Sequence, residues 1–133
     1  MDFEHKAMNL TDKKKIAFIA MSKKSAYFQK HAVKFVLERG YTPISQYGIL
    51  DYFLLDTINR DVIRNANNNL IRISDELWVF GPVSDGVLAE ITIVKKQNKP
   101  VKYFAIENDK DVKEISKNEV EFEEGLEKHR ELL

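Results

Sequence analysis

The run ELWVFGPVSDGVLAEITIVKKQNKPVKYFAI, residues 76–106, contains a strand, a helix and a second strand in succession. Residues 76–80 are rich in β-forming side chains, and the strand stops at Gly81-Pro82. Ser84 is a good N-cap for a helix over 85–96, which fades before Pro100, and residues 101–106 form the next strand. This order predicts two parallel strands joined by a right-handed crossover.

The residues before this run repeat the same alternation. Residues 16–21 are apolar without a two-residue period, which is typical of a strand buried on both faces of a parallel sheet. A helix capped by Ser22 is expected next, ending at Arg39-Gly40, and it is followed by a brief strand over 41–44 and an amphipathic helix over 59–73. Four such alternations predict an α/β fold. We expect a single Rossmann-like, flavodoxin-like three-layer sandwich with a four- or five-stranded, mainly parallel sheet.

The two ends of the chain lack this pattern. Residues 1–12 are polar and unperiodic, and we expect them to form a flexible N-terminal arm. Residues 13–133 are expected to form one α/β domain, because 133 residues are close to the usual size of a single domain. Within it, a short helical stretch is expected over 109–115 and an acidic C-terminal helix over about 119–133.

Charge and composition exclude several classes of function. Lys plus Arg number 21 and Asp plus Glu number 21, so no net field attracts nucleic acid or anionic lipid. The absence of cysteine excludes disulfides, thiolate nucleophiles and Cys-ligated zinc. No apolar run approaches the roughly 20 residues that span a bilayer, and no secretory segment follows Met1. We therefore expect a cytoplasmic protein without nucleic-acid or membrane partners.

The expected sheet places several residues at one crevice. In such sheets, ligands bind beyond the carboxyl ends of the strands, where the strand order reverses. There is no Gly-x-Gly-x-x-Gly after the first strand and no Walker loop, so dinucleotide oxidoreduction and ATP hydrolysis lose support. The three histidines are isolated in sequence, which indicates neither a metal site nor a Ser-His relay. A cofactor-free, metal-free site is expected. Its crevice residues are Ser22, Tyr47, Gly48, Gly81, Ser84 and Asp85.

Gly86 and Glu90 form a Gly-x-x-x-Glu sequence after a strand preceded by Asp75, and Lys99-Pro100-Val101 leads into the following strand. Over roughly residues 13–106, this arrangement resembles the nucleoside 2-deoxyribosyltransferase-like superfamily. The resemblance implies an enzyme that cleaves the N-glycosidic bond of a nucleoside or nucleotide, by transfer or hydrolysis. Glu90 would be the nucleophile at the anomeric carbon. The resemblance also implies a homo-oligomer, since enzymes of that family complete their sites across subunit contacts.

Other predicted roles follow from the position of Glu90, which we expect to be partly exposed in a cleft. Ser84, Asp85 and Gly86 would shape the sugar or phosphate site, because N–H groups that open a helix attract a phosphate. Tyr47 is the candidate to orient Glu90, because the tyrosine usual in the family's first strand is absent here.

A second group of candidates lies within residues 59–73. Arg60, Arg64 and Asn68 recur at i, i+4 and i+8, which places them on one helical face. This face could bind a polar ligand or a second subunit, or it could simply be solvated. The asparagines at 67–69 are poor helix formers, which favours a contact role. Arg60 and Arg64 thus join the predicted substrate-binding residues. Tyr52 and Phe53 favour a core position, with stacking on a nucleobase as the alternative.

Two departures from the family pattern leave another function open. The first-strand tyrosine is missing, and Ser84 stands where the family usually has a carboxylate six residues before the nucleophile. A non-catalytic nucleotide-binding or sensing module of the same fold is therefore the alternative. A third possibility is an interaction domain whose N-terminal arm and acidic C-terminal helix mediate assembly.

Overall fold

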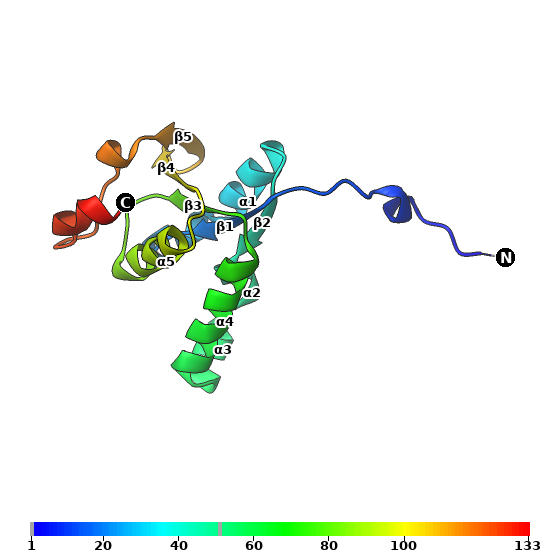
Figure 1. Ribbon diagram of the computed structural model, residues 1–133, viewed down its shortest axis with the longest axis horizontal. Coiled ribbons are helices and arrows are strands. Elements are labelled where there is room, and N and C mark those ends of the chain that lie inside the picture. The colour runs from blue at the N-terminus through cyan, green and yellow to red at the C-terminus, as the bar shows by residue number, and fades with distance from the viewer. Residues whose placement is uncertain (1, 51) are drawn as a thin grey trace.

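In a computed structural model, which describes residues 2–50 and 52–133 without the side chains of 52, 53 and 55, a five-stranded sheet has the order β2-β1-β3-β4-β5 (Figure 1). The strands are β1 (Ile16–Ala20), β2 (Thr42–Ser45), β3 (Glu76–Phe80), β4 (Val101–Glu107) and β5 (Asp111–Ile115). The pairings β1–β2, β1–β3 and β3–β4 are parallel, and β4–β5 is antiparallel. The predicted mainly parallel, Rossmann-like α/β sandwich is confirmed, with the flavodoxin-like strand order.

Helices cover both faces of this sheet. Helix α1 (Gln29–Glu38) packs on one face, and α4 (Arg60–Ile73) and α5 (Asp85–Lys96) pack on the other. Successive residues of β3 serve opposite sides, because side chains alternate along a strand. Leu77 and Val79 join the apolar cluster under α4 and α5, while Trp78 and Phe80 join the cluster under α1. The central strands are therefore buried on both faces, as the unalternating apolar runs predicted.

The prediction of a helical stretch over 109–115 is wrong. These residues form β5, which pairs with β4 from Tyr103↔Ile115 to Glu107↔Asp111. The turn between the two strands contains Asn108 and Asp109 at φ angles of 53° and 61°. Asn and Asp tolerate this left-handed region better than other non-glycine residues, so they close a hairpin where a helix was expected.

The predicted acidic helix over 119–133 is also wrong. This segment holds only short 3₁₀ turns, η3 (Lys117–Glu119) and η4 (Glu127–Leu132). Between them the chain is extended beside the loop that follows β3, where the Val83 N–H donates to the Glu121 carbonyl and the Glu123 N–H donates to the Val83 carbonyl, both at 2.9 Å. These bonds and Gly125, at φ +86°, prevent a continuous helix.

Ser22 does not cap a long helix as predicted. It precedes a 3₁₀ segment, η2 (Lys23–Phe28), and its side chain makes no capping hydrogen bond. The Ser25 N–H donates to the Ser22 carbonyl at 3.0 Å, which sets the i→i+3 pitch. This pitch turns both Ser25 and Phe28 inward before α1 begins.

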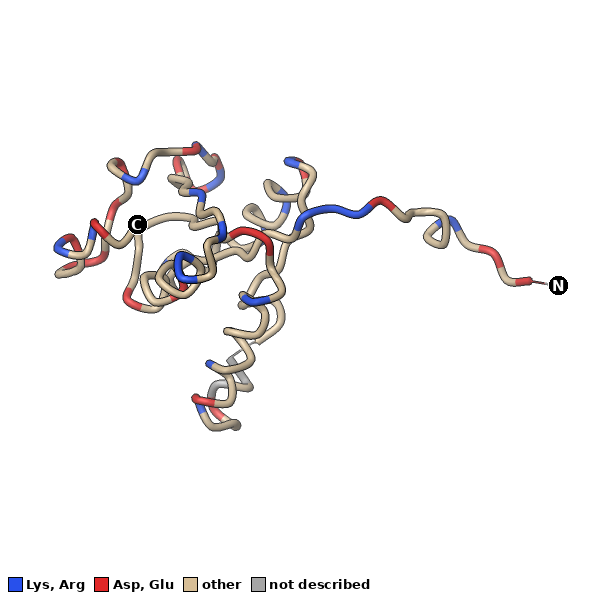
Figure 2. Tube along the Cα trace, viewed as in Figure 1, with Lys and Arg blue, Asp and Glu red and all other residues tan. Residues whose placement is uncertain are grey.

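The N-terminal residues lead away from the sheet, as Figure 1 shows, and they include the short turn η1 (Lys6–Asn9). Figure 2 shows the basic run at residues 13–15 where this arm meets β1, and acidic residues along the C-terminal segment. Over residues 2–50 and 52–133, no helix combines the length and apolar character needed to cross a membrane.

Candidate functional site

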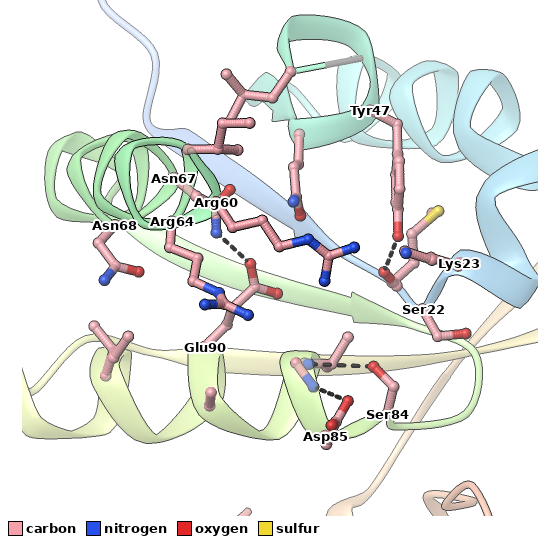
Figure 3. A pocket seen from close by; sticks show the side chains of 18 of the residues that line it. Ser22, Lys23, Tyr47, Arg60, Arg64, Asn67, Asn68, Ser84, Asp85 and Glu90 are labelled. Atoms are coloured by element: carbon pink, nitrogen blue, oxygen red, sulfur yellow. Dashed lines mark hydrogen bonds between the residues drawn. The ribbon is translucent and has the colours of Figure 1, made fainter. Parts of the chain in front are cut away.

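A cavity of about 660 Å³ lies at the carboxyl end of β1, beside the point where the strand order reverses (Figure 3). One wall is the start of the segment after β1, and a second is α2 (Gln46–Ile49), a single helical turn. The other walls are α4, residues of α5 between Asp85 and Ile93, and one residue of the C-terminal segment. This is the position at which α/β sheets of this order bind ligands.

Glu90 lies in the wall of this cavity, on α5. Its neighbours one turn away on α5, such as Val87 and Val94, are buried apolar residues, and α4 packs against this helix. Only 7 % of Glu90 is exposed, so the expected partly exposed carboxylate is buried instead. The reason is packing between α4 and α5, which the spacing within α5 alone does not reveal.

Burial changes the acidity of this carboxyl group. Removal from water raises the pKa of Glu90 from the ordinary 4.5 to about 7. A hydrogen bond from the side chain of Asn67 favours the ionised form and partly opposes this shift. Glu90 therefore changes charge near neutral pH, and a buried carboxyl group of this kind at a cavity wall is a common feature of catalytic sites.

Asn67 holds Glu90 in place. Its Nδ2 donates to Glu90 Oε2 at 2.7 Å, as the dashed line in Figure 3 shows. Asn67 is itself buried, and its Oδ1 has no hydrogen-bond partner among the described residues. This role was not predicted from the sequence, although the unusual asparagines at 67–69 in a helix were the signal for it.

Tyr47 and Ser22 both line the cavity, as predicted, at the carboxyl end of β1. The Tyr47 hydroxyl donates to the Met21 carbonyl at 3.1 Å, so this bond anchors the tyrosine to the end of β1. Asn67 donates a hydrogen bond to Glu90, and a role of Tyr47 in orienting Glu90 stays a prediction. Ser22 is buried, and within the described part of the chain its Oγ has no partner.

Ser84, Asp85 and Gly86 come together at the start of α5, as predicted. Ser84 is the N-cap, and its Oγ accepts from the Val87 N–H at 3.3 Å. The Asp85 carboxylate accepts from the Gly86 N–H at 2.7 Å. Side chains of the protein therefore already accept hydrogen bonds from two of the N–H groups that were predicted to bind a phosphate.

Arg60 and Arg64 reach from α4 into the space between α4 and α5, and Asn68 lies on the same helix (Figure 3). The cap of α4 is Asn59, whose side chain accepts from the Asp61 N–H at 2.8 Å. Asp61 in turn pairs with Arg64 at 3.0 Å on the exposed surface. The predicted basic face of this helix thus contributes to the cavity.

The two remaining predicted glycines play a packing role. Among the described residues, neither Gly48 nor Gly81 lines the cavity. A Cβ at Gly48 would lie 2.9 Å from Gln29 Nε2, and a Cβ at Gly81 would lie 2.9 Å from Ser25 Oγ. Gly81 also adopts φ +80°, which allows the tight turn out of β3. The suggested stacking role of Tyr52 and Phe53 concerns side chains outside those that the structure describes.

Further cavity residues were not among the predicted site residues. Lys23 and Lys24 follow Ser22, and Glu123 enters from the C-terminal segment that pairs with Val83. The two lysines were visible in the sequence as a basic pair after the first strand, whereas Glu123 lies 27 residues after the end of α5. Within residues 2–50 and 52–133, no three His, Asp or Glu side chains gather in a way that could hold a metal ion.

A comparison with protein families matches residues 17–104 to one described as "Domain of unknown function (DUF7768)". The chain belongs to that family. The DUF7768 match runs from β1 into β4, so it includes Glu90, Asn67 and both arginines, and it ends before β5 and the segment carrying Glu123. A comparison with curated proteins finds no match.

Proposed function

We propose that this protein cleaves the N-glycosidic bond of a nucleoside or nucleotide, with Glu90 as the nucleophile. The observation that carries the proposal is the Glu90 carboxyl group, buried in the wall of a cavity at the carboxyl edge of the sheet and held by Asn67 at 2.7 Å. A carboxylate suits this chemistry, because its charge stabilises an oxocarbenium-like transition state and its oxygen can form a covalent bond.

The reaction would proceed in two steps. An oxygen of ionised Glu90 attacks the anomeric carbon while the bond to the base breaks. The electron pair of that bond leaves with the base nitrogen, which takes up a proton. Water or the nitrogen of a second base then attacks the same carbon and loses its proton, and the ester bond breaks with its electrons returning to Glu90. Attack by water gives hydrolysis, and attack by a base gives transfer.

The size of the cavity supports a ligand of this class. Its volume of about 660 Å³ lies within the range of roughly 300–1,000 Å³ that is typical of small-molecule sites. Apolar residues such as Met21 and Ile63 line it together with polar and charged side chains. This mixture suits a ligand with an aromatic base and a polar sugar.

The experiment incubates the protein with a panel of nucleosides, deoxynucleotides and NAD, and measures the release of free base by chromatography. We expect wild-type protein to release base from at least one member, and Glu90→Gln to lower the rate by about a thousandfold or more. Glu76→Gln is the matched control, because Glu76 is equally buried at the opposite end of β3, where it accepts from Tyr41 Oη and Trp78 Nε1. Equal rates for Glu90→Gln and wild type would reject the nucleophile.

The second candidate function is a nucleotide-binding module without turnover. One observation favours it: with a pKa of about 7, much of Glu90 is protonated at neutral pH and is then a hydrogen-bond donor rather than a nucleophile. Binding of a nucleotide, measured by calorimetry, with no base released from any member of the panel would favour this function over catalysis.

A further inference from the structure

The charged side chains of the cavity are divided between two sides. Lys23 and Lys24 follow β1, and Arg60 and Arg64 extend from α4. Across the cavity, Asp85 and Glu90 lie on α5, and Glu123 enters from the C-terminal segment. Figure 3 shows the guanidinium of Arg60 on the side of α4 that faces the cavity, with Ser22 and Lys23 at the end of β1. Such a division favours a ligand whose negative charge is at one end.

The start of α5 is poorly suited to that negative charge. The N–H groups of Gly86 and Val87 already donate to Asp85 Oδ1 and Ser84 Oγ. An anion bound there would have to displace these acceptors and approach the Asp85 carboxylate. Like charges at close range repel, so the attraction of the helix N-terminus is offset by its own side chains.

The basic side, in contrast, has donors to offer. Within the described part of the chain, no carboxylate lies within ion-pair distance of Arg60. Ser22 is only 5 % exposed, and its Oγ has no hydrogen-bond partner among the described residues. A buried hydroxyl without a partner is unusual, because its desolvation is not compensated. A ligand oxygen that accepts from this hydroxyl would satisfy it.

We infer that the basic side, made by Ser22, Lys23 and Arg60, holds the phosphate group of a nucleoside 5′-monophosphate. Phosphate oxygens accept strong hydrogen bonds from guanidinium and ammonium groups, and Arg64 and Lys24 add to the positive potential. The sugar then lies towards Glu90. This inference rests on the proposed function for the nucleoside part of the ligand, and it names the phosphorylated form as the ligand over the free nucleoside.

The test is calorimetry on the full chain with each of the four common ribonucleosides, its 5′-monophosphate, and inorganic phosphate alone. For at least one base, we expect the monophosphate to bind at least about tenfold more tightly than the nucleoside. Inorganic phosphate alone should bind more weakly than that monophosphate. The comparison with inorganic phosphate distinguishes recognition of a nucleotide from recognition of any phosphate.

Two variants locate the phosphate. Arg60→Gln should lower the affinity for the monophosphate by about tenfold or more and leave that for the nucleoside nearly unchanged. Arg72→Gln is the matched control, since Arg72 is exposed on the same helix but does not line the cavity. It should change neither affinity.

Several results would overturn the inference. They are equal affinities for nucleoside and monophosphate with every base, no binding by any member of the panel, and inorganic phosphate that binds as tightly as the monophosphates. The inference would also be overturned if Arg60→Gln bound the monophosphate as tightly as wild type while Asp85→Asn bound it more tightly. This result would place the phosphate at the start of α5. None of these affinities depends on turnover. If the phosphate inference fails, the protein can still release base in a reaction that requires Glu90. Conversely, the protein can prefer monophosphates even if it releases no base.

Discussion

At the scale of single residues, the protonation of Glu90 determines what the cavity can do. The carboxyl group is buried, and Asn67 is the donor that favours its ionised form. Because burial is the larger effect, the pKa of Glu90 lies at about 7. Two predictions follow from this one value, one for activity and one for stability.

The activity should depend on pH near neutrality. A nucleophile must be ionised, so kcat/KM for base release should rise with pH through about 7 and level off above it. Asn67→Ala removes the donor that favours ionisation, and this rise should move to higher pH. Asn65→Ala, at an exposed position on the same helix, should leave the profile unchanged. A rate that falls as pH rises from 6 to 8 would contradict ionised Glu90 as the nucleophile.

The stability should respond to pH in the opposite direction. The pKa of Glu90 is higher in the folded protein than its ordinary value of 4.5, so the folded state binds the proton more tightly. The tighter binding of this proton stabilises the folded protein, and the stabilisation is complete below about pH 4.5. It is lost as the pH rises towards 7 and changes little above pH 7.

Glu90→Gln cannot ionise, so at pH 8 we expect it to exceed wild type in free energy of unfolding by on the order of 1–3 kcal/mol. This difference should shrink towards pH 5. Denaturant unfolding at both pH values measures it, and Glu38→Gln, at an exposed position on α1, serves as control with little difference at either pH. A Glu90→Gln variant that is less stable than wild type at pH 8 would show that Glu90 is not held as a desolvated acid.

The sequence could place Glu90 on a helix next to a glycine-containing loop, because those features are local. Its burial could not be predicted in the same way, because it depends on α4, a helix far away in sequence. The asparagines at 67–69 indicated a contact without showing which of them turns inward. Asn67 does so, while Asn69 donates to the Asn65 carbonyl of its own helix.

At the scale of elements, the turn from β3 into the cavity loop depends on Gly81. Gly81 adopts φ +80°, and a Cβ built there would lie only 2.9 Å from Ser25 Oγ. Both the backbone angle and the lack of space therefore disfavour a side chain at this position. Gly40, after α1, has φ +82°, but a Cβ there would meet nothing within 4 Å. A substitution at Gly40 therefore tests the backbone angle alone, and a substitution at Gly81 tests the backbone angle together with close packing.

Gly40→Ala should lower the free energy of unfolding by about 1 kcal/mol, from the left-handed backbone alone. Gly81→Ala should lower it by about 2–3 kcal/mol, because Ser25 and Ile106 must also move away from the new methyl group. Denaturant unfolding of both variants under the same conditions measures the difference. Equal losses would mean that the packing around Gly81 yields without cost.

Elements with strong local signals were predicted well, and the others were not. Helix α5 has a Ser cap and a clear apolar side, and it begins and ends where the sequence indicated. The residues after β4 carry sparse apolar positions, and their structure is set by partners elsewhere: β5 pairs with β4, and the segment at Glu121 pairs with Val83. Such pairings leave little trace in a local pattern, so Glu123 was not predicted to reach the cavity.

At the scale of the whole molecule, the strand order produces the site. The strand order reverses between β1 and β3, which leaves a gap at the carboxyl edge of the sheet. Helices α4 and α5 flank this gap on the same face of the sheet. The alternation of strands and helices was enough to predict this architecture, because parallel strands and right-handed crossovers leave few other topologies. The cavity residues gather from elements that are distant in sequence, so their mutual contacts required the structure.

The N-terminal arm bears on whether the molecule self-associates, as the sequence led us to expect. Phe3 and Leu10 are 78 % and 81 % exposed, and Met8 is also exposed, so the arm carries large apolar side chains into solvent. Its backbone hydrogen bonds are local, from the Met8 N–H to the His5 carbonyl and from the Leu10 N–H to the Ala7 carbonyl. A second copy of the chain could bury these side chains, which would be favourable by the hydrophobic effect.

We therefore expect the full chain to sediment as a species heavier than 15.5 kDa, and a chain lacking residues 2–12 to shift towards the smaller mass of its own monomer. The deletion should change the thermal midpoint of the monomeric domain little, because Ile16 is fixed beyond the cut by its N–H bond to Asp75 Oδ2 at 2.7 Å. Sedimentation velocity at several concentrations measures the mass. A full chain that stays at 15.5 kDa throughout would rule out self-association, and an oligomer unaffected by the deletion would assign the contact to another surface, such as the exposed Asn65 and Asn68 on α4.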